Sequence, residues 1–524
     1  MPLEFLVPII GDYLAPIMFT CLVIFLLSGY PVAFALAANG LVFAVLGIGM
    51  GLFTPEFLQA LPNRIFGIMA NDTLLAIPFF TFMGLILERS GMAEDLLDTI
   101  GQLFGPIRGG LAIAVIFVGA LLAATTGVVA ASVISMGLIS LPIMLRYGYD
   151  RRLATGVIAA SGTLAQIIPP SLVLIIMADQ VGRSVGEMYM GAMIPGLVLT
   201  GFYVGYVILV SLFKPQHAPA LPLSARSITG IPLLVKCLVV LVPPLFLIFL
   251  VLGTIFLGIA TPTEGGAMGA SGAMLLALAK KKLDFTLLRQ AIESTAKLSS
   301  FVMFILIGAT VFGLVFRGVN GDLWVEHLLT SLPGGQAGFL IAVNILFFVL
   351  AFFLDFFELA FILVPLVAPV AESLGIDLVW FGVLLAVNMQ TSFMHPPFGF
   401  ALFYLRSVAP TKRYKDAVTG ETMEPVTTSQ IYWGSIPFVC IQILMVALII
   451  AFPQLVSVEK REVMEDTPLE ITLPMDEQSL QEGMAGMESA ANENPHLQGY
   501  GEDEQALDPS KLQFSTDEPG EKKQ

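Results

Sequence analysis

Charged residues are scarce in this 524-residue sequence: 12% are Asp, Glu, Lys or Arg, whereas 56% are hydrophobic. The mean hydropathy is +0.86. Soluble globular domains carry about twice this share of charge, roughly 25%, because their surface faces water. Several apolar stretches also reach the length of about 18 residues that a transmembrane helix needs. The sequence therefore predicts a polytopic, all-α integral membrane protein.

Cysteine and histidine are also rare, with three and four residues. Cys21, Cys237 and Cys440 all lie in apolar segments and form no CxxC pair, so we expect packing residues and neither a disulfide framework nor a thiolate metal site. The histidines form no HExxH motif and the chain has no GxSxG motif, which argues against an intramembrane hydrolase. The basic residues form no patch interleaved with aromatic residues, so nucleic-acid binding has no support.

Most of the net charge of −15 lies in one segment. Residues 459–524 contain 17 acidic and 5 basic residues, which accounts for −12 of the total. This polar, aromatic-poor composition cannot bury enough apolar surface to fold. We therefore predict a transmembrane permease domain over residues 1–455, followed by an acidic, disordered tail over residues 456–524. The N-terminus has no basic region and no cleavage site, so we interpret the first apolar run as a retained span.

A broken helix is predicted within residues 159–178, AASGTLAQIIPPSLVLIIMA. Pro170 cannot donate a backbone hydrogen bond, and it disfavours helical geometry at Pro169, so the helix is interrupted at its centre. Inside a bilayer, unpaired backbone groups are tolerated only where they face protein, water or a bound solute. Secondary transporters build their binding sites from such interruptions. The segment thus predicts a transport site.

Twelve apolar stretches are candidate spans, two of them long enough to form hairpins. They cover residues 12–28, 31–50, 73–88, 110–142 (doubled), 153–178, 188–213, 231–259, 263–280, 299–316, 336–370 (doubled), 378–405 and 431–453. Two amphipathic pieces, residues 92–104 and 283–298, are read either as interfacial helices or as ordinary loop helices.

Landmarks in the first part of the chain recur in the second part at offsets of 223 to 231 residues. The hairpin containing Thr126 is matched by the hairpin containing Asp355, and Pro169 is matched by Pro396. A repeat of this kind predicts two structural halves, residues 12–213 and 231–453, with re-entrant hairpins at 110–142 and 336–370.

The distribution of basic residues predicts the orientation. The loop after the first hairpin contains Arg146, Arg151 and Arg152 and should be cytoplasmic, whereas residues 371–378 after the second hairpin contain no Lys or Arg. The two halves should therefore be inverted relative to each other. This arrangement places the N-terminus and the acidic tail in the periplasm.

Polar residues at the hairpin tips and at the helix breaks are the candidate binding residues. Hydroxyl, amide, carboxylate and carbonyl oxygens are hard donors that suit Na⁺. The candidate sodium ligands are Thr126, Gly127, Ser161, Gly162, Asp355, Asn388 and Thr391. The candidate substrate-binding residues are Thr125, Thr163, Gln166, Pro169, Ser171, Gln390, His395, Pro396 and Gly399. No arginine lies in these segments, so we expect an anionic substrate to be held by helix N-termini and neighbouring polar groups.

Some of these residues have an alternative, structural interpretation. Thr125 and Thr126 could bond back to their own helix, and Asp355 could be a protonated structural acid. Glu358 could complete a carboxylate pair or face outward as an anchor. His395 could be a pH-sensitive ligand or a packing residue.

Together these segments resemble a known family. The blocks LPIMLRYGYDRRLATGVIAASGTLAQIIPPS, ATPTEGGAMGA, LDFFELAFILVPLVAP and NMQTSFMHPPFGFALF are similar to the large membrane subunit of TRAP (tripartite ATP-independent periplasmic) transporters. The resemblance covers residues 29–453. It implies import of an organic acid driven by Na⁺, with the hairpin-bearing domain moving as an elevator against a static scaffold. It also implies two partners, a small membrane subunit of about four spans and a periplasmic substrate-binding protein.

The sequence departs from the family pattern at three positions. Val128 stands where serine is usual, His395 where threonine usually precedes the proline pair, and Glu358 where a small residue is common. The DFFE and MHPPFGF variants, which contain Glu358 and His395, resemble a branch often associated with keto acids, hydroxy acids or other compounds outside the C4-dicarboxylates. A stand-alone sodium/carboxylate or sodium/proton transporter is the alternative, and an intramembrane enzyme is a more remote one.

Overall fold

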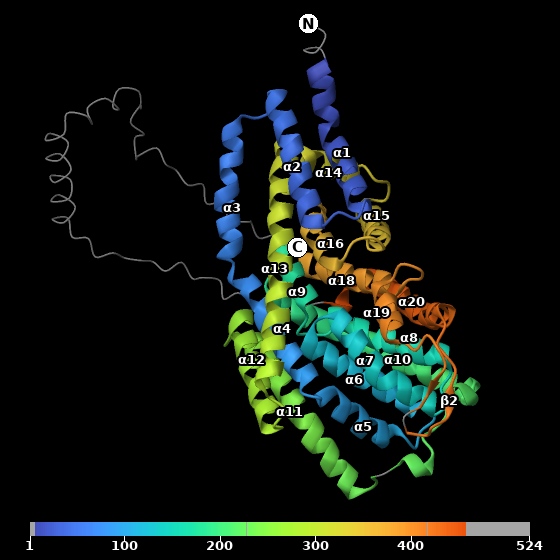
Figure 1. The fold of residues 1–524 in the computed structure, drawn as a ribbon. Coiled ribbons are helices and arrows are strands. Elements are labelled where there is room, and N and C mark those ends of the chain that lie inside the picture. Colours follow the sequence, from blue (N-terminus) through green and yellow to red (C-terminus); the bar gives the residue numbers. More distant parts are fainter. Residues whose placement is uncertain (1–5, 227, 417, 457–524) are drawn as a thin grey trace, which may run out of the picture. The chain divides into compact units, whose positions relative to one another are not determined.

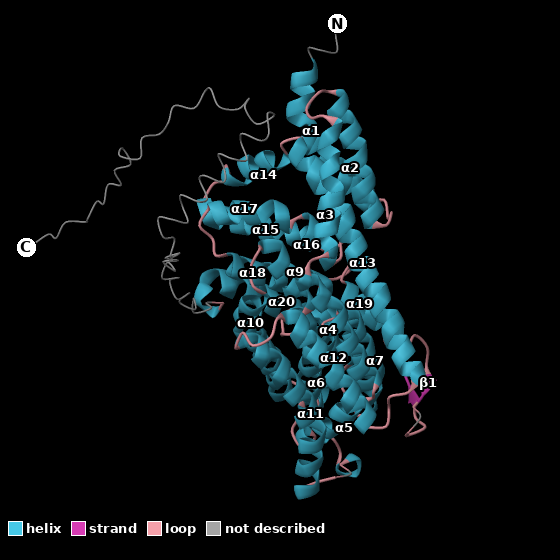
Figure 2. Cartoon of the chain, turned by 90° about the vertical axis from the view of Figure 1, so that its left-hand side faces the viewer, coloured by secondary structure: helices cyan, strands magenta, loops and turns pink. Residues whose placement is uncertain are grey.

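The computed structural model describes residues 6–226, 228–416 and 418–456, and this part of the chain is nearly all helical (Figures 1 and 2). Six of its helices are long and apolar enough to cross a membrane, or up to nine if each bent helix pair counts as one span. The expected all-α, multi-pass membrane protein is therefore confirmed at this level. The predicted acidic tail falls outside the described residues, apart from Val456.

Most of the helices in the described chain are joined by short connections, and the longest connections are residues 214–230 and 409–427. Up to residue 213 they are α1 (Leu6–Leu27), α2 (Val32–Gly49), α3 (Ala60–Met69), α4 (Asp72–Arg89), α5 (Met92–Phe104), α6 (Gly110–Thr126), α7 (Val129–Arg146), α8 (Arg151–Thr163), α9 (Leu172–Val181) and α10 (Val185–Phe213). Beyond it they are α11 (Ile231–Phe256), α12 (Pro262–Ala279), α13 (Phe285–Gly318), α14 (Gly321–Thr330), α15 (Gly335–Leu350), α16 (Phe356–Ile362), α17 (Val364–Ser373), α18 (Leu378–Met394), α19 (Phe400–Val408) and α20 (Thr428–Ala451). Strands β1 (Tyr414–Lys415) and β2 (Thr422–Met423) pair antiparallel.

The first predicted hairpin consists of α6 and α7, which are in contact and joined by a tight turn. Gly127 ends α6 with φ +60°, and its N–H donates to the carbonyl of Ala123. Glycine reaches this left-handed conformation at no steric cost, which is why it commonly ends helices.

The second predicted hairpin consists of α15 followed by α16 and α17. Its returning arm bends by 52° between α16 and α17. Pro365 lies in the first turn of α17 and has no N–H to continue the ladder of the preceding helix. The matching Pro142 lies inside a continuous α7. The returning arm is therefore divided into two helices at the proline of the second hairpin but not at that of the first.

Two interrupted helices occupy the core. Residues 164–171, which begin with a 3₁₀ turn at Leu164–Gln166, separate α8 from α9, and residues 395–399 separate α18 from α19. Both unwound segments contain a Pro-Pro pair, as expected, and the Pro169–Pro170 and Pro396–Pro397 peptide bonds are cis. Nearly every residue of α8, α9 and α18 is buried, and so are most residues of the first break, whose freed backbone groups therefore face protein and not lipid. In the second break Pro397 and Phe398 are exposed.

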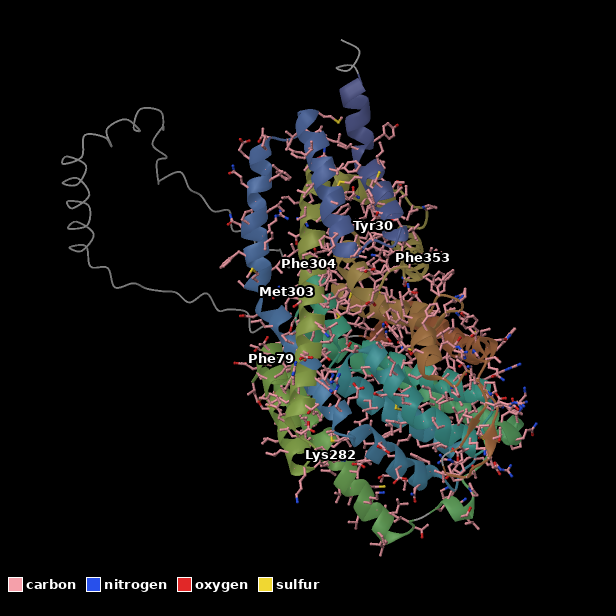
Figure 3. The ribbon with its side chains drawn as sticks, viewed as in Figure 1. Tyr30, Phe79, Lys282, Met303, Phe304 and Phe353 are labelled. Carbon is pink, nitrogen blue, oxygen red and sulfur yellow. The ribbon has the colours of Figure 1, made fainter. Side chains whose placement is uncertain are left out.

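One long helix, α13, runs past both the N-terminal helices and the core (Figure 1). It contacts α2, α3, α4 and α16. Figure 3 shows Lys282 near the end where α13 starts, with Met303 and Phe304 further along the helix. The predicted division of this region into an amphipathic piece, 283–298, and a span, 299–316, is wrong. The segment has no Pro or Gly before Gly308, so its charged first half continues the same helix.

Two helices, α3 and α14, were not predicted. The α3 helix contains Pro62, but this proline lies in the first turn, where a missing N–H breaks no hydrogen bond. The α14 helix has only 10 residues and joins α15 at an angle of 118°.

Candidate functional site

Both hairpin tips, the first helix break and the helices that flank the second break line a single cavity of about 150 Å³, which we call the central cavity. It is bounded on one side by Leu298 and Phe301 of α13. The other lining residues are Gly127, Val128, Val129 and Ala130 from the first tip, Gln166, Leu172 and Val173 from the first break, Asp355, Phe356 and Phe357 from the second tip, and Phe393 and Tyr404 from helices α18 and α19. The structure thus brings three candidates, Gly127, Gln166 and Asp355, to one place.

Asp355 is the N-cap residue of α16. Its carboxylate accepts a hydrogen bond from the N–H of Phe356 at 2.7 Å, while the Glu358 carboxylate accepts from the N–H of Asp355 at 3.0 Å. The two acids therefore form a reciprocal capping box that shapes the second tip. Glu358 is buried and does not line the central cavity. Its burial excludes an outward-facing anchor, and its absence from the lining excludes a second acid in this cavity.

Gln166 is fully buried and lines the central cavity. Within the described residues, neither its side-chain nitrogen nor its oxygen has a hydrogen-bond partner. Leaving such groups unpaired costs about 1–3 kcal/mol. Its backbone carbonyl, in contrast, accepts from the Ser171 hydroxyl at 2.8 Å and holds the break in shape. The amide is therefore free to bind a solute.

The N-termini of α7 and α9 open onto the central cavity. Val128 and Ser171, their N-cap residues, make no side-chain hydrogen bond to the first turn. The first N–H groups of each helix carry a partial positive charge that favours anions. No Lys or Arg is among the described residues that line the cavity, so these helix ends and Gln166 are among the groups that can receive an anion there.

A second polar cluster lies deeper in the core, on α8, α10, α18 and α20. The Gln390 side chain donates to the Thr163 hydroxyl at 3.3 Å, and Gln442 donates to the Tyr203 hydroxyl at 2.8 Å and to Thr163 at 3.5 Å. Neither Tyr203 nor Gln442 was predicted from the sequence. Gln442 could have been found, because an amide inside the apolar stretch 431–453 must have a partner.

The central cavity is not lined by four further sodium candidates, Ser161, Gly162, Asn388 and Thr391. Ser161 donates to the carbonyl of Ile158 at 3.1 Å, Asn388 to that of Asn344 at 2.7 Å, and Thr391 to that of Val387 at 3.3 Å. Gly162 packs against Val133 of α7. The side chains of Thr125 and Thr126 lie outside the described part of the structure. No group of three or more His, Cys, Asp and Glu in the described chain could hold a metal ion.

The remaining substrate candidates lie on the unwound segments. His395 packs against Phe348 and Phe352, with ring centroids 5.3 and 5.0 Å away, and its Nδ1 atom is buried without a partner in the described residues. Gly399 donates its N–H to the carbonyl of His395 at 2.8 Å. Pro169, Ser171, Pro396 and Gly399 shape the breaks without lining the central cavity.

Comparison with known proteins identifies the family. The family described as "Tripartite ATP-independent periplasmic transporter, DctM component" matches residues 19–455. The chain belongs to this TRAP transporter family. It is 31% identical over 370 residues to the C4-dicarboxylate TRAP transporter large permease protein of Pseudomonas aeruginosa, covering 68% of this chain and 82% of the relative. It is 29% identical over 415 residues to the Rhodobacter capsulatus protein of the same name, covering 74% and 89%.

The fold of this TRAP permease is also found in a solved transporter. The Alcanivorax borkumensis YdaH transporter is similar over 78% of this chain and 91% of its own, with a TM-score of 0.52 and 15% identity. The resemblance seen in the sequence is thus confirmed: the chain is a large permease subunit and a multi-pass membrane protein. It is a transporter component and not an enzyme.

Proposed function

We propose that this TRAP permease imports an organic acid together with Na⁺, and that the central cavity is where the two meet. The observation that carries the proposal is the composition of this cavity. It combines both tips and the first break with one carboxylate, one unpartnered amide and the N-termini of two helices. Such a set can bind a cation and an anion side by side.

Na⁺ would be a co-transported substrate of the permease. Asp355 supplies a carboxylate oxygen and Gln166 an unpartnered amide oxygen, and both are hard donors. One carboxylate with a few dipoles is enough for a monovalent ion, whereas a divalent ion needs a cluster of acids. We propose that other candidate ligands bind a second Na⁺ ion or bind Na⁺ in a different state of the transporter. These are Thr126, Ser161, Asn388 and Thr391.

The acid group of the substrate would lie against the N-termini of α7 and α9. These ends stabilise a negative charge by up to about 2 kcal/mol when partly buried. Relatives are named for a C4-dicarboxylate, 2,3-diketo-L-gulonate, isethionate and sialic acid, all organic acids. The shared feature is an anionic headgroup, and we assign only this class to the present chain.

We further propose two inverted halves, residues 12–213 and 231–453, that move solute by an elevator mechanism. The support is structural: hairpin α6–α7 followed by broken helix α8–α9 is matched by hairpin α15–α17 followed by broken helix α18–α19. The basic residues near Arg146 and Lys280–Lys282 favour the cytoplasmic side for the loops that carry them. The N-terminus and the tail would then be periplasmic.

Two partner proteins complete the proposed transporter. The family name describes a tripartite system, and one relative is named as a DctMQ permease. A small membrane subunit and a periplasmic substrate-binding protein are therefore the expected partners of this inner-membrane subunit. The binding protein would deliver the acid to the outer face.

Reconstitution of the three components in lipid vesicles tests the proposal. Uptake of the acid that the cognate binding protein retains should require both an inward Na⁺ gradient and added binding protein. A K⁺ gradient of the same size is the control for ionic strength. Uptake without binding protein would instead support a stand-alone carboxylate carrier, and uptake without Na⁺ would contradict the proposed coupling.

A further inference from the structure

A second cavity, of about 350 Å³, lies toward the C-terminal end of α13, and we call it the outer cavity. Arg64 from α3 and Arg317 from α13 line it together. Helices α3 and α13 are in contact and lie side by side in Figure 1. The two arginines thus bring two positive charges to one hollow, although they are more than 250 residues apart in sequence.

Neither guanidinium is neutralised in the described chain, where no ion pair or side-chain hydrogen bond involves Arg64 or Arg317. Among the described lining residues Asp179 is the one acid, and it is hydrogen-bonded to two neutral amides that line the same cavity. Its two oxygens accept from Asn71 at 2.6 Å and from Gln180 at 2.7 Å. The lining therefore keeps a net positive charge, and paired planar guanidinium groups suit a carboxylate.

The outer and central cavities share the same walls. On α13, Leu298 and Phe301 line the central cavity, whereas Leu306 and the turns up to Arg317 line the outer one. At a rise of about 1.5 Å per residue, Phe301 and Leu306 are only about 8 Å apart along the axis. The same helix, α13, therefore lines both cavities at positions close together along its axis.

Two other helical segments make the same connection. The first turn of α9 lines the central cavity, and its last turn, with Asp179 and Gln180, lines the outer one. In the second hairpin, Asp355 lines the central cavity and Phe361 the outer one. The outer cavity thus neighbours the central cavity along three shared helical segments.

We propose that Arg64 and Arg317 form an outer anion site, which holds the carboxylate of an incoming acid before it enters the central cavity. The direction of travel rests on the proposed function and on its orientation: α13 starts beside the cytoplasmic Lys280–Lys282, so its far end with Arg317, and Arg64 next to it, would be periplasmic. Binding of a carboxylate at the site does not depend on either, so it can be tested separately.

Chemical protection of arginine tests the site. The full-length chain, in nanodiscs of neutral phosphatidylcholine and without Na⁺, is treated with phenylglyoxal, and the rate of modification of each arginine is followed by mass spectrometry. Succinate or pyruvate at about 10 mM, above the Kd of a weak millimolar site, should slow modification of Arg64 and Arg317 at least about fivefold, in line with charge-assisted hydrogen bonds. Arg183, which is half exposed and 3.7 Å from Glu372, is the internal control.

Three variants test whether protection depends on the outer site itself. Arg64→Gln should remove the protection of Arg317, whereas Arg183→Gln should not. Asp355→Asn should keep the protection intact even where Na⁺-stimulated uptake is lost, so the two proposals can fail independently. The outer site is overturned if neither acid protects, if chloride at equal ionic strength protects as well, or if Asp355→Asn removes the effect. Equal protection by phosphatidylglycerol nanodiscs alone would reveal a lipid headgroup site and would also overturn it.

Discussion

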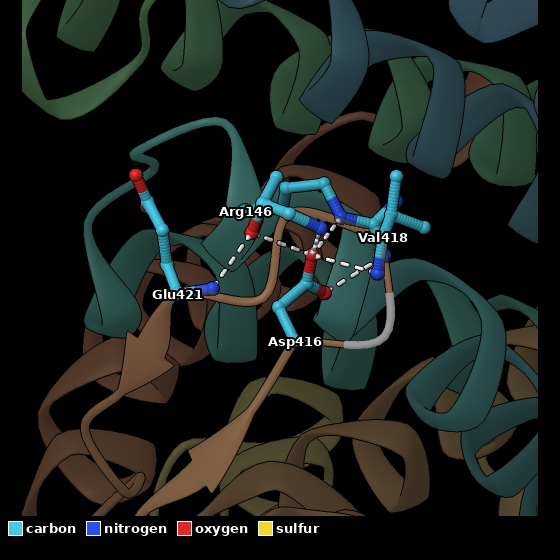
Figure 4. A network of polar contacts seen from close by, with 5 residues as sticks. Arg146, Asp416, Val418 and Glu421 are labelled. Carbon is cyan, nitrogen blue, oxygen red and sulfur yellow. Dashed lines mark hydrogen bonds and ion pairs between the residues drawn. The ribbon is translucent and has the colours of Figure 1, made fainter.

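Arg146 holds Asp416 in a two-pronged ion pair, with its Nε and Nη2 atoms 2.9 and 2.8 Å from the two carboxylate oxygens (Figure 4). Asp416 also accepts hydrogen bonds from the N–H and the hydroxyl of Thr419 at 2.8 and 2.9 Å, and it is buried. The pair fixes the end of the first hairpin to the β1–β2 segment, 270 residues further along the chain. A bidentate pair of this kind defines geometry as well as adding energy.

The ion pair should give stability that persists in mild acid. The Arg146 guanidinium holds the pKa of Asp416 well below its usual range. A carboxyl group with a lowered folded pKa contributes stability above its unfolded value of about 3.9, and this contribution is lost as the pH falls from there toward the folded pKa. Asp416→Asn should therefore lower the melting temperature by a constant amount from pH 8 to pH 5, and the difference should shrink below about pH 4.

The pair formed by Arg413 and Glu424 is the matched control for this titration. It joins the same types of group at 2.8 Å, but its side chains are 70% and 54% exposed. Exposed pairs contribute about 0–1 kcal/mol, so Arg413→Gln should hardly change the melting temperature. An equal loss in both variants would mean that the contact between α7 and the strand pair has no special role.

Close packing of α8 against α20 gives a prediction about stability. A Cβ atom on Gly156 would overlap the carbonyl oxygen of Gly434 and lie 2.8 Å from the ring of Phe438. Gly156→Ala should therefore lower the free energy of unfolding by about 1–3 kcal/mol or more, because the helices must separate. In α10, Gly201 has no atom within 4 Å of the corresponding position. Gly201→Ala should be neutral or stabilising in the same thermal assay, and a similar loss in both variants would contradict the packing argument.

A substitution of Gln166 should affect transport without reducing the stability of the fold. The Gln166 amide has no partner among the described residues. Gln166→Leu should therefore leave the free energy of unfolding unchanged or raise it by up to about 1–3 kcal/mol, while uptake is lost. The control is Gln442→Leu, which removes a hydrogen bond of 2.8 Å to Tyr203 and should lower the melting temperature. Normal uptake by Gln166→Leu would exclude a role for this amide in binding.

Much of the fold could be predicted because the signals were local. Apolar runs of sufficient length mark the helices, and the proline pairs at Pro169 and Pro396 mark the two interruptions. The errors in the predicted fold arose where a sequence pattern does not determine where a helix begins or ends. Charges in the first half of α13 suggested a boundary, but charge alone does not stop a helix that contains no Pro or Gly in that half.

The site was predicted less completely than the fold. Position at a hairpin tip or helix break, together with residue type, made Gly127, Gln166 and Asp355 candidates, and the structure places all three around one cavity. The sequence could not show that Glu358 caps α16, because the same residue pair also fits a two-acid ligand set. Nor could it show that Tyr203 meets Gln442, since that contact depends on how α10 and α20 pack.

The most direct test of the central claim compares two N-cap aspartates. Asp355 and Asp377 both accept hydrogen bonds from the first turn of a helix, but only Asp355 lines the central cavity. The measurement is uptake by vesicles with and without an inward Na⁺ gradient, in the presence of binding protein. Asp355→Asn should insert normally and lose the Na⁺-stimulated component, whereas Asp377→Asn should retain it. Unchanged Na⁺ stimulation in Asp355→Asn would contradict a role for this carboxylate in coupling.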